Sequence, residues 1–171
     1  MTETETETET EAETETRNLL ALREKYMGEA LALAKQAGEL GEVPIGAIIV
    51  RDGEIIGRGY NQTICAKDPT AHAEIVALKD AAAKISNHRI VNADMYVTIE
   101  PCTMCAGALV HARLATLFFG APEPRAGAVI SSAAVLDNPG LNHHVTVIPY
   151  IRQAEAAELM SNFFKQKRRE K

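Results

Sequence analysis

Two short stretches contain the residue types of a catalytic metal site. His72-Ala73-Glu74 and Pro101-Cys102-Thr103-Met104-Cys105 stand about thirty residues apart and offer one imidazole, two thiols and one carboxylate. Zinc binds thiolate and imidazole ligands in a tetrahedral array, and catalytic zinc sites keep one of the four positions open for water. We therefore predict a zinc site formed by His72, Cys102 and Cys105. Glu74 is too close in sequence to His72 to ligate the same ion comfortably, so we predict that it carries protons for the bound water.

Both stretches are predicted to open helices. Asp68-Pro69-Thr70 breaks the chain and caps a helix over residues 71–85, and Pro101 opens a second helix that runs to about residue 112. At about 100° per residue, Cys102 and Cys105 lie about 60° apart on a helix, so both sulfurs can face one ion. His72 and Glu74 would point about 200° apart on a regular turn, so we expect His72 at an irregular helix start.

A Cys-x-x-Cys motif alone also fits a redox dithiol or a structural zinc site. A structural site needs a fourth protein ligand, and no second Cys-x-x-Cys or histidine pair stands at a suitable spacing. Cys65, the remaining cysteine, is interpreted as a small buried or loop residue without a role. His-x-Glu followed by Pro-Cys-x-x-Cys is instead the motif of zinc-dependent nucleobase deaminases.

Acidic charge is concentrated at one end of the chain. The formal net charge is -5, but the first sixteen residues contain seven glutamates and no basic residue, which leaves eighteen basic against sixteen acidic side chains in the rest. The last seven residues are distinctly basic. We therefore predict a disordered acidic tail over residues 1–17 and one domain over residues 18–171. A nucleic-acid partner is compatible with this distribution.

Cysteine content and hydropathy indicate where the protein resides. Three cysteines are an odd number and do not form a disulfide framework. No apolar run approaches membrane-spanning length, and the N-terminal segment lacks the features of a secretory or mitochondrial targeting sequence. We therefore expect a cytoplasmic protein with no membrane partner.

Apolar periodicity and turn residues outline the remaining elements. A helix is expected over residues 19–37, and Asp52-Gly53 is a strong hairpin signal between strands at residues 45–50 and 54–60. Further strands are expected at residues 95–99, 114–119 and 145–151, and a last helix at residues 154–167. Strands that alternate with helices after an initial hairpin predict a three-layer α/β/α domain with a mixed, about five-stranded sheet.

The zinc motif and its flanks resemble those of the bacterial tRNA-specific adenosine deaminases, in the cytidine/deoxycytidylate deaminase superfamily. The resemblance runs from about Glu24 to Arg168. Beyond the zinc motif it includes residues 42–47, 68–75, 100–108, 119–121 and 139–143, and Phe163-Phe164 followed by basic residues. It implies a cytidine-deaminase-like fold, one Zn²⁺ per subunit, and a homodimer that binds a tRNA anticodon loop across both subunits.

The resemblance also implies a reaction and the residues around its substrate. The reaction is hydrolytic deamination of adenosine to inosine in the anticodon loop, at the wobble position. Asn61 is implied to read the base, and Ala73 to border it. Glu123 and Arg125 stand where the family has an acid and a base beside the nucleotide, although the acid is often aspartate.

Phe163 and Phe164 precede the basic C-terminal residues, and two interpretations of this end remain open. One aromatic ring could stack on a base of single-stranded RNA while the lysines and arginines contact phosphates. The same pattern also fits a plain amphipathic helix with a solvated basic end.

Two other functions fit the same residues. A deaminase of a free small base or nucleoside, such as guanine or cytosine, would use the same metal and the same glutamate. A zinc-stapled RNA-binding module would use the metal without catalysis. Inosine formation in a tRNA stem-loop distinguishes the tRNA deaminase from a deaminase of free bases. A requirement for Glu74 in turnover distinguishes it from a non-catalytic RNA-binding module.

Overall fold

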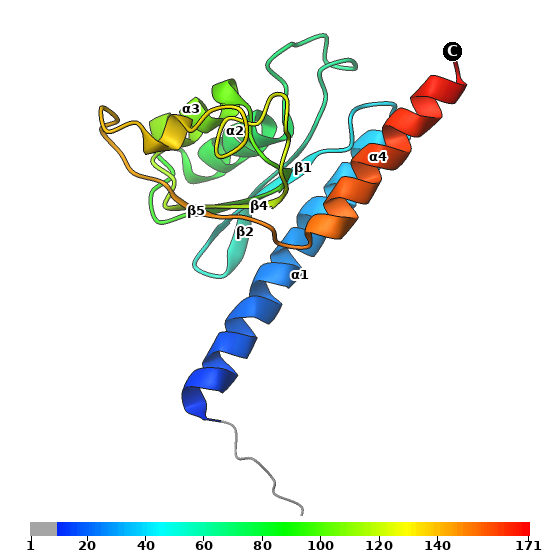
Figure 1. Ribbon diagram of the computed structural model, residues 1–171. Coiled ribbons are helices and arrows are strands. Elements are labelled where there is room, and N and C mark those ends of the chain that lie inside the picture. Colours follow the sequence, from blue (N-terminus) through cyan, green and yellow to red (C-terminus); the bar gives the residue numbers. More distant parts are fainter. Residues whose placement is uncertain (1–9) are drawn as a thin grey trace, which may run out of the picture.

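A mixed five-stranded sheet forms the middle layer of the fold (Figure 1). The computed structural model describes residues 10–171. The elements in chain order are α1 (Glu11–Glu39), β1 (Gly46–Arg51), β2 (Glu54–Tyr60), α2 (Ala73–Ile85), β3 (Asp94–Ile99), α3 (Thr103–Ala112), β4 (Thr116–Ala121), the short 3₁₀ helix η1 (Val135–Asp137), β5 (Thr146–Ile148) and α4 (Gln153–Arg169). Each predicted helix and strand is present; the ends of most differ by a few residues, and the first helix begins eight residues earlier than predicted.

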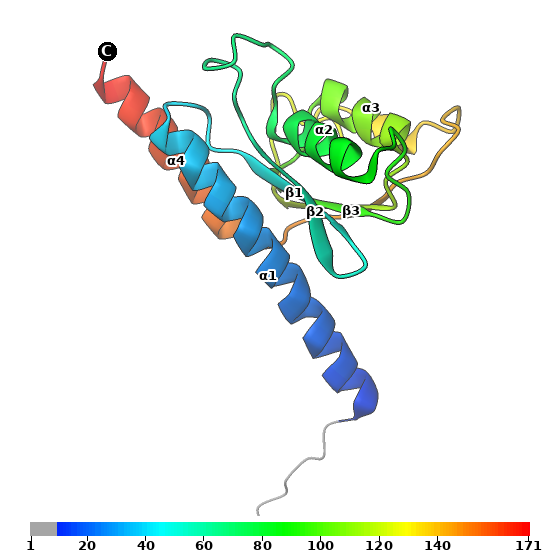
Figure 2. The same ribbon diagram turned by 180° about the vertical axis from the view of Figure 1, so that it is seen from behind.

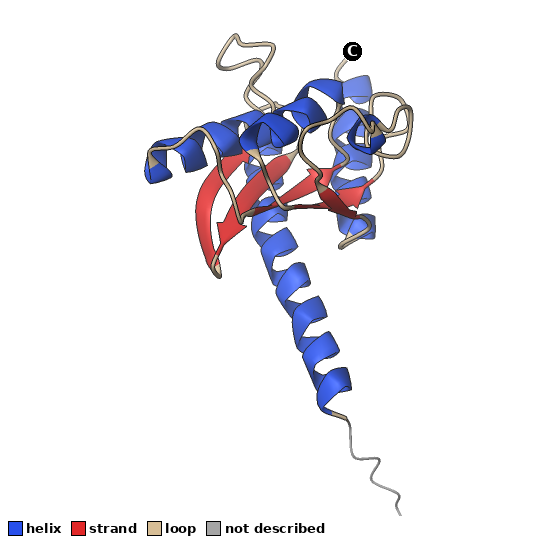
Figure 3. Cartoon of the chain, turned by 90° about the vertical axis from the view of Figure 1, so that its left-hand side faces the viewer, coloured by secondary structure: helices blue, strands red, loops and turns tan. Residues whose placement is uncertain are grey.

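Helices cover both faces of the sheet. The strand order is β2-β1-β3-β4-β5; β1 is antiparallel to β2 and β3, while β3, β4 and β5 are parallel. Helices α2 and α3 lie on one face (Figure 3), and α1 and α4 lie side by side on the other (Figure 2). The predicted three-layer α/β/α architecture with a mixed sheet is therefore confirmed.

Alternate side chains of the central strands form two separate cores. Ala47 and Ile49 of β1 pack in the cluster beneath α2 and α3, whereas Ile48 packs in the cluster beneath α1 and α4. Tyr96 of β3 faces the same side as Ile48, its register partner, and stacks on Phe118 with ring centroids 4.3 Å apart. Each fully buried large apolar side chain contributes about 1.5–3 kcal/mol, so this alternation stabilises both helical layers.

Helix α1 begins earlier than the sequence pattern predicted. Thr10 accepts a hydrogen bond from the Glu13 amide while the Glu13 side chain accepts one from the Thr10 amide, which forms a capping box at Glu11. The prediction of disorder through residue 17 is therefore wrong for residues 11–17, and residues 1–9 lie outside the described part of the chain. The helix starts early because these two hydrogen bonds give partners to the Thr10 and Glu13 amides, which would otherwise be unpaired at the helix N-terminus.

A glycine at the start of β1 allows α1 to lie close to the sheet. A Cβ atom at Gly46 would overlap with the Ala30 carbonyl oxygen and approach the Ala34 amide. At the other end of β1, Asp52 and Gly53 both have positive φ, 53° and 76°, which matches the predicted tight hairpin turn. These positions fix how β1 pairs with β2 and how α1 packs against β1.

The C-terminal part differs from the prediction at the edge of the sheet. Strand β5 has three residues and ends at Ile148. The Ile151 amide still donates to the Phe119 carbonyl of β4 at 3.1 Å, but positive φ at Tyr150 and Arg152 interrupts the strand and turns the chain into α4. Arg152 donates to the Glu24 carbonyl of α1 and pairs with Glu155, which ties the start of α4 to α1.

The adjacent ends of β3 and β4 lead into the candidate site. Ile99 of β3 pairs with Ala121 of β4, and the residues that follow are Glu100-Pro101-Cys102 and Pro122-Glu123. Loops at the carboxyl ends of parallel strands are the usual location of functional residues in α/β proteins. Within the described residues 10–171, no helix is both long and apolar enough to cross a membrane.

Candidate active site

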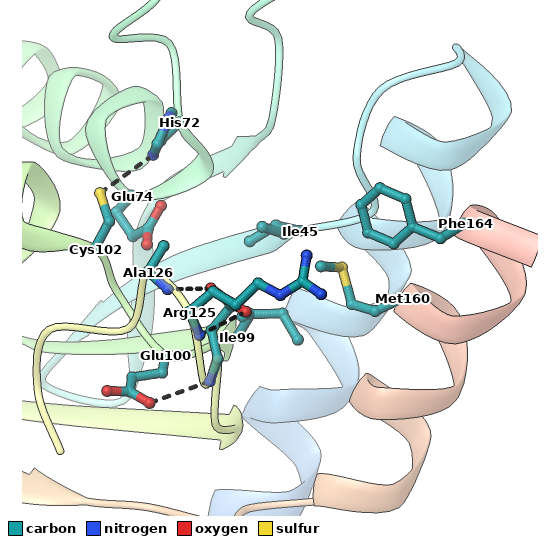
Figure 4. Close-up of a pocket in the computed structure, with 11 residues that line it drawn as sticks. Ile45, His72, Glu74, Ile99, Glu100, Cys102, Arg125, Ala126, Met160 and Phe164 are labelled. Carbon is teal, nitrogen blue, oxygen red and sulfur yellow. Dashed lines mark hydrogen bonds between the residues drawn. The ribbon is translucent and has the colours of Figure 1, made fainter. Parts of the chain in front are cut away.

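The three predicted ligands come together at the starts of α2 and α3 (Figure 4). His72 is the residue before α2 and has extended backbone angles, φ −71° and ψ 154°, as expected from the conflict between its direction and that of Glu74. Cys102 occupies the same position before α3, and Cys105 follows in the first turn. The Nδ1 atom of His72 lies 3.6 Å from the Sγ atoms of both cysteines.

Hydrogen bonds among the three ligands shift their pKa values in different directions. Hydrogen bonds from Cys105 and His72 lower the pKa of the Cys102 thiol to about 3. The bond to Cys102, together with burial, raises the pKa of Cys105, and the bond to Cys102 also raises the pKa of His72. These shifts favour the thiolate form of Cys102, and a cation bound here would displace the protons that Cys105 and His72 tend to retain.

Glu74 projects into the same site from the first turn of α2. Its side chain is only 3% exposed, and burial raises the pKa of its carboxyl. Within residues 10–171, its Oε2 atom is buried and has no hydrogen-bond partner. A buried polar atom without a partner is costly, so the arrangement is complete only when water or another polar group lies beside Glu74. Two sulfurs, one imidazole and this carboxylate fit a catalytic zinc site.

A pocket of about 460 Å³ opens over this cluster. Its lining combines metal-ligand and acidic side chains with apolar groups from four other segments: Ile45, His72, Glu74, Ile99, Glu100, Cys102, Glu123, Arg125, Ala126, Met160 and Phe164. Figure 4 shows Arg125 extending toward Met160 and Phe164 of α4, on the side opposite His72. The pocket therefore has a polar end at the ligands and a mouth bordered by a cation and an aromatic ring.

Comparison with known proteins identifies the family. A model described as MafB19-like deaminase matches residues 22–168 of the chain. A tRNA-specific adenosine deaminase from Haemophilus influenzae is 46% identical over 149 residues, which cover 86% of this chain and 86% of the relative. The chain belongs to the tRNA-specific adenosine deaminase family.

Solved structures agree with membership of the tRNA-specific adenosine deaminase family. One, from studies of A-to-I editing by tRNA:A34 deaminases at the wobble position of transfer RNA, has a TM-score of 0.77 and 43% identity, and the match covers 79% of this chain and 98% of that chain. The guanine deaminase of Bacillus subtilis has a TM-score of 0.57 and 31% identity, covering 64% and 80%. The fold is thus shared with an enzyme of another base, and the higher identity to tRNA-specific adenosine deaminases separates the two.

The structure separates the remaining predicted site residues of this family member into two groups. Glu123, Arg125 and Phe164 line the pocket. The other three lie behind or beside it: Asn61 is buried at the end of β2, Ala73 is fully buried in α2, and Phe163 packs edge-on against Phe164 with centroids 5.3 Å apart. Their roles in substrate binding remain predictions.

Two buried carboxylates of this deaminase were not assigned a role from the sequence. Glu42 is fully buried and accepts hydrogen bonds from the Ile64 and Cys65 amides, at 2.9 and 2.7 Å. It also accepts from the Asn61 side-chain amide at 3.5 Å. Glu100 is 4% exposed and lines the pocket. In the sequence, each of these acids stands beside an apolar residue and close to a proline, and this setting was the available signal that the carboxylate is buried.

Proposed function

We propose that this chain catalyses hydrolytic deamination of adenosine to inosine in the anticodon loop of a tRNA, at the wobble position. The observation that carries the proposal is the buried Glu74 carboxylate beside the His72, Cys102 and Cys105 ligands, whose Oε2 atom has no hydrogen-bond partner within residues 10–171. The identity to tRNA-specific adenosine deaminases, at 46% over most of the chain, directs this chemistry to adenosine in tRNA.

One Zn²⁺ per subunit fits the site, held by His72, Cys102 and Cys105. Two thiolates and an imidazole are ligands that zinc prefers, and three protein ligands leave a fourth position for water. When bound, zinc lowers the pKa of a water molecule to about 7 and so supplies a nucleophile at neutral pH.

Glu74 transfers the protons of the reaction. Its carboxylate accepts a proton from the attacking water and delivers it to N1 of the adenine while the oxygen adds to C6. A second proton transfer from oxygen to the departing amine breaks the C6–N bond and releases ammonia, which leaves the C6 carbonyl of inosine. Burial of Glu74 supports this role, because its raised pKa makes the carboxyl a better proton acceptor.

The shape of the pocket suits a base that has left its stack. Its end at Glu74 is deep, whereas its mouth is bordered by the exposed residues Arg125 and Phe164. Bases of an anticodon loop can be turned outward at low cost, while a base in a duplex must first be unpaired. We infer that Phe164 stacks on the nucleotide and that Arg125 contacts a phosphate.

Assembly and location follow from the same function. We infer a homodimer that binds tRNA across both subunits, on the basis of the resemblance to the family. We infer a cytoplasmic location because the substrate is tRNA and because Cys65, Cys102 and Cys105 are all free thiols. Light scattering of the purified chain tests the first inference.

The decisive experiment compares substrates under one set of conditions. The zinc-loaded protein is incubated with an anticodon stem-loop that carries adenosine at the wobble position and, separately, with adenosine, guanine and cytosine. Inosine formation in the stem-loop, with little ammonia from the free compounds, is the expected result. Deamination of free compounds alone would overturn the proposal. A stem-loop with guanosine in place of the target adenosine is the matched control.

A further inference from the structure

Glu100 is a buried carboxylate at the junction of β3 and the ligand segment. It follows Ile99, the last residue of β3, and precedes Pro101-Cys102. Its Oε2 atom accepts hydrogen bonds from the amides of Val129, Ile130 and Ser131, at 3.1, 2.9 and 3.0 Å. Three successive amides directed at one oxygen form an anion-binding nest, which the chain fills with its own side chain.

The second carboxylate oxygen binds the other end of the same loop. Oε1 of Glu100 accepts from the Glu123 amide at 3.1 Å, the bond drawn at Glu100 in Figure 4, and also from the Ser131 hydroxyl. The Ala128 amide donates to the Pro101 carbonyl at 2.9 Å. The loop of residues 123–131 is therefore wrapped around one carboxylate and bonded to the segment that carries Cys102.

The backbone has no room for a different arrangement at this point. A Cβ atom at Gly127 would overlap with the Glu100 carboxylate and with the Glu123 carbonyl oxygen. Glycine therefore lets the loop close tightly over Glu100. The Arg125 and Ala126 amides at the exposed tip donate to the Glu123 side chain, which belongs to the loop itself. The bonds to Glu100 instead tie the loop to the segment that carries Cys102.

This loop forms one wall of the active-site pocket. Glu123, Arg125 and Ala126 line the pocket opposite His72, and Glu100 itself lies at the base of that wall. A shift of the loop would change the distance between these residues and the ligand cluster. Because Arg125 is proposed to contact the substrate, such a shift would weaken substrate binding.

We propose that Glu100 is a positioning residue that holds the loop of residues 123–131 at a fixed distance from Cys102 and so sets substrate binding. The inference rests on the proposed function for its kinetic part only. Both oxygens of a carboxylate accept hydrogen bonds, whereas glutamine offers one acceptor and an NH₂ group that would oppose the loop amides. Glu100→Gln therefore keeps the size of the side chain and disrupts the anchor.

Hydrogen exchange tests the anchor independently of activity. In Glu100→Gln, the amides of Val129, Ile130 and Ser131 are expected to exchange at least about tenfold faster, while amides in β1 and β3 keep their protection and zinc content is unchanged. Equal acceleration across the sheet would reduce Glu100 to a general stability role and overturn the proposal, as would unchanged exchange at residues 129–131. Glu54→Gln, in the exposed hairpin away from the pocket, is the matched control.

Kinetics test the consequence for the substrate. Glu100→Gln is expected to raise KM for the anticodon stem-loop about tenfold with a smaller change in kcat, since loss of binding made equally in ground and transition state appears in KM. A fall in kcat with KM unchanged would overturn the positioning role. Ser131→Ala removes one hydrogen bond from the same carboxylate and should show a smaller effect of the same kind, which keeps the test available if Glu100→Gln folds poorly. Absence of deamination in the unaltered protein would refute the proposed function and leave the exchange result standing.

Discussion

The Nδ1 atom of His72 lies 3.6 Å from the Sγ atom of Cys102, although the two residues are thirty positions apart in the chain. Each residue immediately precedes a helix, and the two helices lie on the same face of the sheet. The ligand cluster is therefore a tertiary contact between two strand-to-helix connections, and the packing of α2 and α3 must be in place before the three ligands meet.

Removal of a cysteine ligand should abolish tight metal binding. Cys102→Ser is expected to weaken zinc binding by at least about a hundredfold, since loss of residues that merely orient a ligand already costs about 10–100-fold. Competition with a chromophoric chelator measures the change. Cys65→Ser is the control, because Cys65 is exposed and lies outside the cluster. Unchanged zinc affinity in Cys102→Ser would contradict the site.

Replacement of the proton carrier should separate chemistry from metal binding. Glu74→Gln preserves the shape of the side chain but cannot accept and return a proton, so kcat is expected to fall by about 10²–10⁴-fold. Zinc content should stay at the level of the unaltered protein. Single-turnover formation of inosine, measured beside metal analysis of the same preparation, gives both values. Deamination at the normal rate in this variant would rule out the mechanism.

Glu42 should make stability depend on pH. Burial alone would raise the pKa of the Glu42 carboxyl, but hydrogen bonds from the amides of Cys65 and Ile64 outweigh that effect and hold its pKa below the ordinary value of 4.5. Ionised Glu42 therefore stabilises the fold fully above pH 4.5, and this contribution is lost as pH falls through the lower folded pKa.

Urea unfolding of Glu42→Gln measures this contribution. At pH 7 the variant should be less stable by about 1–3 kcal/mol, because buried amide donors lose a charged acceptor. The difference from the unaltered protein should shrink below pH 4.5. Glu54→Gln, an exposed substitution, should stay within about 0.5 kcal/mol at both pH values. If the difference in unfolding free energy between Glu42→Gln and the unaltered protein instead grows on acidification, the predicted direction of the pH dependence is wrong.

The two adjacent phenylalanines should contribute unequally to RNA binding. Phe164 lines the pocket, whereas Phe163 packs against its edge and beneath the Lys167 ammonium. Stacking of a base on an aromatic ring is worth about 1–3 kcal/mol, so Phe164→Ala should raise KM for the stem-loop about tenfold or more. Phe163→Ala should have the smaller effect, and Phe164→Trp should retain binding. The reverse order would assign the stacking ring to Phe163.

Local chemistry made the ligands predictable from sequence. Cys102 and Cys105 are spaced to share one ion, and the expected irregularity at His72 is present as an extended residue before α2. The hairpin turn at Asp52-Gly53 was equally clear, because such a turn needs positive φ at both residues and few residue types adopt it readily. Each of these signals lies within a few consecutive residues, although the histidine and cysteine segments meet only in the folded chain.

The misjudged features depend on partners elsewhere or on competing patterns. The run of like-charged glutamates suggested disorder, but Thr10 and Glu13 form a capping box that starts α1 at Glu11. Glu42 and Glu100 could not be assigned because their hydrogen-bond donors lie nineteen or more residues away in the chain. Only the folded chain shows which loops these two carboxylates hold.

The start of helix α1 and the end of helix α4 lie at different distances from the pocket. Its Glu11 end runs beyond the sheet and away from the pocket, whereas α4 carries Phe164 at the pocket mouth and leads directly to the C-terminus (Figures 1 and 2). A fluorescent label or fused domain attached through the Glu11 end would therefore leave the entrance clear. The same addition after Lys171 would crowd the approach of a large substrate. Comparing the activity of the two fusions would therefore show from which side the substrate arrives.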